Sequence, residues 1–122
     1  MEVKKALNKW RFVSGAVSLV IAFCAFVAGQ DALRYGDYLC AVCEWYTGVV
    51  VAVAGLATIM FKCDNREAVT VAMFMHLSVV ALGVVLALAG RLSGMSEFLL
   101  WSAVCCVAGY INMRVYNFGL EE

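Results

Sequence analysis

The sequence predicts an all-α polytopic membrane protein, in which four transmembrane helices form one antiparallel bundle with both termini on the same side. The first observation is composition: the 122-residue chain is 65% hydrophobic and 15% charged, has no proline, and has a mean hydropathy of +0.89. Soluble domains are nearer half apolar and about one quarter charged, so this chain has too little polar surface to cover a water-soluble globule. The second is the presence of four apolar runs of near-membrane length. The third is that basic residues gather at alternate ends of these runs.

A single domain spanning residues 1–122 is expected, because no linker-like or low-complexity stretch divides the chain. The first helix is predicted at about 12–29. It is about 27 Å long at 1.5 Å per residue, close to the ~30 Å hydrocarbon core. A basic head, residues 1–11, precedes it with Trp10 placed for the interface. Such a head resembles the start of a signal peptide, but the length of the following run favours an uncleaved anchor.

The second and third helices are predicted at about 45–61 and 68–90, on either side of the polar segment 62–67. Residues 30–44 are expected to form a polar outer loop; the alternative is that the second helix begins nearer Leu39, with Glu44 at the level of the lipid headgroups. Four aromatic residues crowd this boundary as an aromatic belt does: Tyr35, Tyr38, Trp45 and Tyr46.

The fourth helix is predicted at about 98–113, after a tight turn at 91–97 in which Ser96 is a helix-start signal, and it extends to Tyr116 if Arg114 reaches the interface. Seven basic residues then fall on the side of the two termini, and two, Arg34 and Arg91, fall on the other. The positive-inside rule therefore predicts both termini on the cytoplasmic-type side, which is the matrix side in a mitochondrial inner membrane.

Two matched octets predict how the helices pack. Residues 48–55 (GVVVAVAG) and 83–90 (GVVLALAG) differ only by exchange of Val and Leu. Membrane helices associate through close packing that small residues permit, so the second and third helices are expected to touch at Gly48 and Gly83 with near backbone contact. The alternative is that Gly and Ala are simply common in membrane helices. The predicted packing residues are Gly48, Ala52, Gly55, Gly83, Ala87 and Gly90.

His76 is the single histidine and the one ionisable residue that the predicted spans place well inside the membrane. Such a residue is a functional hypothesis by default. We interpret it as a candidate cofactor-binding residue, near bound lipid or near a neighbouring subunit's haem, quinone or pigment, with no cofactor of the chain's own. The alternative is a neutral imidazole that hydrogen-bonds a neighbouring helix.

Cys40 and Cys43 form a C-x-x-C in the predicted outer loop. One such pair is weak evidence for zinc, so no metal site is predicted. In an oxidising compartment the two would be a possible disulfide or thiol pair. The alternative is that both are small apolar residues near the membrane surface.

No enzymatic activity is predicted, because no set of nucleophile, base and stabiliser is recognisable and every carboxylate falls in a predicted loop or at a helix end. Net charge is zero, which argues against a nucleic-acid partner, and no soluble substrate is evident. Polar residues of the spans look scattered, which disfavours a pore within one chain: Ser14, Ser18, Thr47, Thr58, Thr70, Ser78, Ser102 and Asn112.

The sequence therefore favours a non-catalytic accessory subunit of a large respiratory or photosynthetic type of membrane complex, with other membrane subunits and lipids as partners. The mitochondrial inner membrane is the favoured setting, and other organelles or the plasma membrane remain open. The alternative function is an independent tetraspan protein that forms a homo-oligomeric channel, carrier or membrane organiser.

Overall fold

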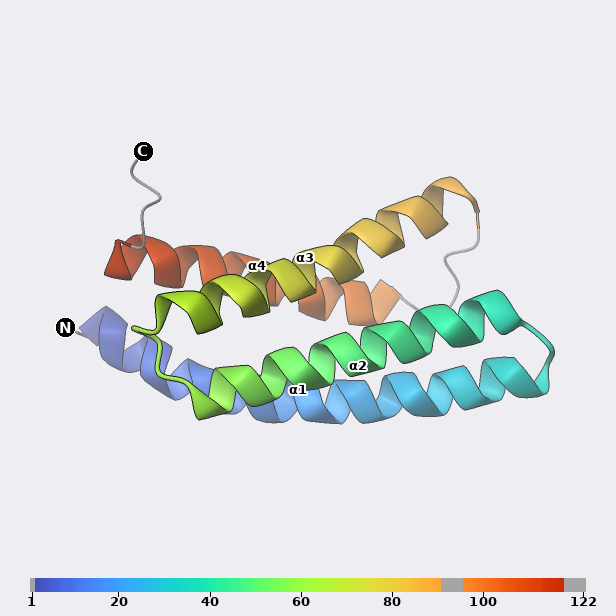
Figure 1. Ribbon diagram of the computed structural model, residues 1–122, viewed down its shortest axis with the longest axis horizontal. Helices are drawn as coiled ribbons and strands as arrows, with labels where there is room; N and C mark the ends of the chain where they lie inside the picture. The colour runs from blue at the N-terminus through green and yellow to red at the C-terminus, as the bar shows by residue number, and fades with distance from the viewer. Residues whose placement is uncertain (1, 91–95, 118–122) are drawn as a thin grey trace.

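The computed structural model describes residues 2–90 and 96–117, and these residues form helices joined by short connections (Figure 1). The helices are α1 (Glu2–Arg34), α2 (Tyr38–Met60), α3 (Arg66–Leu88) and α4 (Ser96–Tyr116). All four are long and apolar enough to cross a membrane. The all-helical class, the four candidate spans and the assignment as an integral membrane protein are thus confirmed.

Helix α1 is much longer than the sequence predicted. Its 33 residues extend about 50 Å at 1.5 Å per residue, against a hydrocarbon core of about 30 Å. Residues 2–11 and 30–34 are therefore helical. Charged residues mark where a helix leaves the hydrocarbon, and they do not by themselves end it.

The predicted outer loop at 30–44 is wrong, because α1 and α2 are joined by a turn of three residues, 35–37. Gly36 has a φ of 77°, a left-handed conformation that glycine adopts without steric cost. Asp37 caps α2 by accepting a hydrogen bond from the Cys40 amide at 3.2 Å. Glu44 consequently lies in the second turn of α2, buried in the bundle with 3% of its surface exposed, and not at a loop boundary.

Helix α3 begins two residues earlier than predicted, because the Asn65 side chain caps it by accepting a hydrogen bond from the Ala68 amide at 3.1 Å. After α3, Gly90 has a φ of 72° and stops the helix in the manner of a C-terminal glycine. The helix start at Ser96 is confirmed. The remainder of the predicted turn, residues 91–95, lies outside the described residues.

The predicted contact between Gly48 and Gly83 is wrong, because the two glycines face different helices. A Cβ at Gly48 would lie 3.2 Å from the Ala22 carbonyl oxygen of α1. A Cβ at Gly83 would meet the Leu99 side chain of α4. Among the helix pairs, α1 packs most extensively against α2, and α3 against α4.

The close contact between α1 and α2 depends on small residues from both helices. A Cβ at Gly55 would lie 2.8 Å from the Ser18 Cβ and 3.1 Å from the Gly15 carbonyl oxygen. Small residues recur along the buried face of α1 at alternating steps of three and four: Gly15, Ser18, Ala22, Ala25 and Gly29. This run of small residues indicates that α1 is the close packing partner of α2, which the two matched octets did not indicate.

The other predicted packing residues contribute less. Ala52 is half-buried, whereas Ala87 and Gly90 are exposed. No atom beyond its own neighbours lies within 4 Å of a Cβ built at Gly90, so its role is the positive φ at the end of α3. The prediction that Ala87 and Gly90 form part of a helix contact is therefore wrong.

One end of the bundle has an apolar core. A buried cluster takes one residue from each helix: Ala25, Cys43, Leu86 and Phe98. These positions come from the last part of α1 and α3 and the first part of α2 and α4. The opposite end of the helices is built differently, and it holds the candidate site.

Candidate functional site

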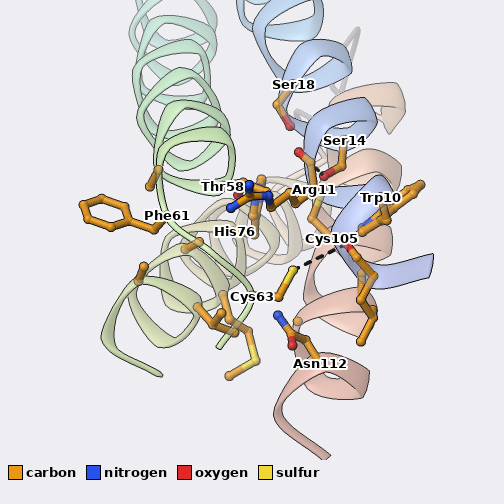
Figure 2. A pocket seen from close by; sticks show the side chains of 18 of the residues that line it. Trp10, Arg11, Ser14, Ser18, Thr58, Phe61, Cys63, His76, Cys105 and Asn112 are labelled. Atoms are coloured by element: carbon orange, nitrogen blue, oxygen red, sulfur yellow. Dashed lines mark hydrogen bonds between the residues drawn. The ribbon is translucent and has the colours of Figure 1, made fainter. Parts of the chain in front are cut away.

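A cavity of about 70 Å³ lies between the four helices at the end opposite the apolar cluster (Figure 2). Its walls come from the first half of α1, the end of α2 with the connection that follows, the first half of α3, and the second half of α4. The basic head and Lys62 belong to this same end. The cavity is thus placed where the chain concentrates positive charge.

Arg11, which is half-buried, is one of two charged residues among the described residues that line this space, the other being Lys62. Figure 2 shows its side chain extending from α1 into the cavity, toward Thr58 and His76. Its Nε and Nη1 atoms are buried and have no hydrogen-bond partner among the residues that the structure describes. The guanidinium carbon lies 4.3 Å from the centre of the Phe12 ring, a contact that stabilises a cation without accepting its N–H groups. Two donors therefore point into the cavity unmatched.

His76 and Asn112 line the cavity from α3 and α4. They are only 4% and 8% exposed. The His76 Nδ1 and the Asn112 Oδ1 are buried, and within residues 2–90 and 96–117 neither has a hydrogen-bond partner. Buried polar groups are nearly always paired with protein, water or ligand. The unpaired atoms of His76, Asn112 and Arg11 would therefore pair with a bound water molecule or ligand.

The hydroxyl groups around the cavity are mostly satisfied. Ser14 donates to the Arg11 carbonyl oxygen at 3.3 Å, and Thr58 donates to the Ala54 carbonyl oxygen at 2.7 Å. The Trp101 Nε1 of α4 donates to the Ser18 Oγ of α1 at 2.9 Å. This last bond links two helices that are far apart in the sequence, so it helps fix the cavity's shape.

Cys63 closes one wall of the cavity from the α2–α3 connection. Its thiol donates to the Leu7 carbonyl oxygen at 3.4 Å, which ties the connection to α1. Burial raises the pKa of this thiol, and the nearby positive charge of Arg11 opposes the rise. Cys63 is therefore a neutral structural group that lies within the electrostatic influence of Arg11.

The structure places the sequence-predicted site residues in two separate regions. His76 lines the cavity and has only 4% of its surface exposed. Cys40 and Cys43 lie in the first two turns of α2, toward the other end. The Cys40 thiol donates to the Glu44 Oε1 at 3.4 Å, whereas Cys43 packs in the apolar cluster.

Glu44 is a residue whose burial the sequence did not reveal. Its Oε2 is buried without a hydrogen-bond partner, although its Oε1 accepts from Cys40. Within the residues that the structure describes, no group of three or more His, Cys, Asp or Glu side chains gathers as a metal site. The Glu44 region is therefore a buried carboxyl–thiol pair.

Arg11 and Asn112 were also missed as site residues. The signal for Arg11 is present in the sequence, because Leu7, Arg11, Ser14 and Ser18 repeat at steps of four, three and four and so share one face of a helix. The polar residues that looked scattered come together in space. Ser14, Ser18, Thr58 and Asn112 line one cavity from three helices.

Chemically, the cavity lining offers the positive charge of Arg11, an imidazole and a side-chain amide, together with three hydroxyl groups, Lys62 and apolar side chains. This arrangement suits the binding of a small polar or charged group. Comparison of the chain with protein-family models, with curated proteins and with solved structures finds no match, so the site is interpreted from its own geometry.

Proposed function

We propose that this chain is a non-catalytic subunit of a larger membrane assembly, in which it acts through helix packing within the bilayer. Its four helices would cross the membrane as an antiparallel bundle, with both termini on the cytoplasmic-type side. Figure 1 supports this topology, since the start of α1 and the end of α4 lie toward the same end of the molecule. The excess of basic residues at that end supports the orientation.

The observation that carries the proposal is the unequal burial of the helices. Half of the most apolar window of α2 is buried within the chain, but only 22% of the corresponding windows of α3 and α4. Most of the surface of α3 and α4 is thus left for lipid or for other membrane helices. The connections at 35–37 and 61–65 are too short to form a domain with a separate activity.

The kind of complex remains the prediction made from sequence: a respiratory or photosynthetic type of assembly, with the mitochondrial inner membrane as the favoured setting. Lipids would fill the remaining apolar surface. The proposal assigns the chain a role in assembly and lipid packing, with no reaction of its own.

The test is the size of the native particle. Membranes that contain the tagged chain are solubilised in a mild detergent and separated by native electrophoresis. The proposal predicts that the chain migrates with a particle many times heavier than its own 13.3 kDa, together with other subunits. Migration only as a monomer or small homo-oligomer would contradict it.

A second function is favoured by one specific observation, the polar cavity. An independent tetraspan carrier or channel needs a polar site between its helices, and this chain gathers Arg11, His76 and Asn112 in one. Under this alternative the chain would run as a small homo-oligomer in the same electrophoresis experiment. It would also move a small charged solute when reconstituted alone in vesicles.

A further inference from the structure

We propose that the cavity between the four helices binds a phosphate-type oxyanion, supplied either by an anionic lipid headgroup or by free phosphate. The ligand would accept hydrogen bonds from Arg11 and exchange hydrogen bonds with His76 and Asn112. This proposal is independent of the assembly role above, because it concerns what occupies the interior of this chain.

The first argument is the charge of Arg11. A guanidinium keeps its positive charge in proteins, and Arg11 is half-buried, with its Nε and Nη1 removed from solvent and without a hydrogen-bond acceptor among the described residues. In the part of the chain that the structure describes, Arg11 forms no ion pair within 4.0 Å. The ion pair found there joins Arg34 to Asp31, at the other end of α1. A bound anion would supply the missing negative charge and accept from Nε and Nη1.

The second argument selects the kind of anion. A halide or a carboxylate only accepts hydrogen bonds, and it would leave the acceptor Asn112 Oδ1 unmatched. A monoprotonated phosphate, or a phosphoester headgroup that carries a hydroxyl, both accepts and donates. It would therefore satisfy Arg11 and Asn112 together, and the His76 Nδ1 can take either role according to its tautomer.

The third argument is size and access. A cavity of about 70 Å³ suits one small oxyanion group and does not enclose a whole lipid. Its lining is mixed, since Leu7, Val69 and Met73 provide apolar walls that would contact the glycerol and first carbons of a lipid. Lys62, which is exposed, lies at the same wall and would attract anions toward the opening.

The test measures the thermal unfolding of the full-length purified chain in a neutral detergent. The probes are sodium phosphate, dioleoylphosphatidylglycerol and dioleoylphosphatidylcholine, with sodium chloride at matched ionic strength as the salt control. For the wild type we expect a higher melting temperature with phosphate, with phosphatidylglycerol, or with both, and no rise with phosphatidylcholine or chloride. A rise with phosphate indicates the free anion as a source, and a rise with phosphatidylglycerol alone indicates the lipid headgroup.

Arg11→Gln should weaken the binding of the active probe about 10- to 100-fold, as expected for loss of charge-assisted hydrogen bonds. Lys9→Gln is the matched control, since it removes the same charge from an exposed position two residues away on α1. Equal responses of Arg11→Gln and wild type would overturn the proposal. A wild type that responds to none of the probes would overturn it too, and would indicate a cavity filled only by water.

Asn112→Asp keeps the shape of the side chain and places a carboxylate in the cavity, so it covers the case in which Arg11→Gln fails to fold. The new negative charge should satisfy Arg11 from within and repel an external anion. We expect this variant to lose the response to the active probe while its circular dichroism stays helical. A folded Asn112→Asp variant that keeps the wild-type response would contradict the proposal.

Discussion

The contact between α1 and α2 makes a quantitative prediction for Gly55. Replacing it with alanine would place a Cβ 2.8 Å from the Ser18 Cβ and 3.1 Å from the Gly15 carbonyl oxygen. Carbon atoms in ordinary contact lie about 3.5–4.0 Å apart, so the two helices must separate by about 0.7–1.2 Å. Neither neighbouring atom can move by a change of rotamer, because one is a Cβ and the other belongs to the backbone.

The expected loss of stability follows from two opposing effects. Overpacking of a close contact typically destabilises by about 1–3 kcal/mol. Alanine is a better helix former than glycine by up to about 1 kcal/mol, which offsets part of the loss. We therefore expect Gly55→Ala to reduce the free energy of unfolding by about 1–2 kcal/mol.

The assay is unfolding of the purified protein in mixed micelles with increasing dodecyl sulfate, followed by circular dichroism. Ala87→Val is the matched control, because it adds bulk to an exposed position of α3 and should change stability by less than about 0.5 kcal/mol. The reasoning would be refuted if Gly55→Ala were as stable as the wild type. It would also be refuted if Ala87→Val were the more damaging change, because that result would indicate a contact made by the octet of α3.

Three further predictions concern single interactions. Asp37→Ala removes the cap of α2 and should destabilise by about 1 kcal/mol in the same unfolding assay, and an unchanged midpoint would show that the cap is not formed. Trp101→Phe removes the hydrogen bond to Ser18 and should destabilise by about 0.5–1.5 kcal/mol, whereas a neutral effect would argue against this link between α1 and α4. The pKa of Cys63 is raised above its ordinary value of 9.0, so alkylation of Cys63 at pH 8, read by mass spectrometry, should be slower in the folded than in the unfolded chain. Equal alkylation rates in the folded and unfolded chain would contradict the burial of this thiol. The stability that the raised pKa provides is present below pH 9.0 and is lost as pH rises through the raised pKa.

The fold class could be predicted because the burial of apolar runs in lipid is a property of composition. The helix ends could not, because hydropathy reports which solvent a residue prefers and not whether the backbone is helical. The basic residues before Phe12 and the polar residues after Gly29 belong to α1. Asp37 and Asn65, both helix caps, were the better boundary signals.

The packing partners could not be predicted from the two octets alone. Small residues identify a face that can approach another helix, but they do not name that helix. Gly48 and Gly55 do lie in a close helix contact, but their partner helix is α1 and not α3. The choice depends on the complementary run of small residues on α1, which a comparison of all four helices would have favoured.

The candidate site was predicted in part. His76 was identified because an ionisable residue within an apolar run is unusual, and it does line a cavity. Arg11 was assigned to the basic head because it adjoins three lysines in the sequence. Its direction into the bundle follows from its position on the helix face shared with Leu7 and Ser14, a feature that charge counting does not register.

The central proposal is that the four helices cross a membrane in alternating directions, which puts the α1–α2 turn and the α2–α3 connection on opposite sides. The most direct test is labelling of single engineered cysteines in sealed vesicles with a membrane-impermeant maleimide. Tyr35→Cys in the α1–α2 turn should be labelled from one side only, and Lys5→Cys and Lys62→Cys from the other, above the background of the native cysteines. Labelling of Tyr35→Cys and Lys62→Cys from the same side would contradict the account.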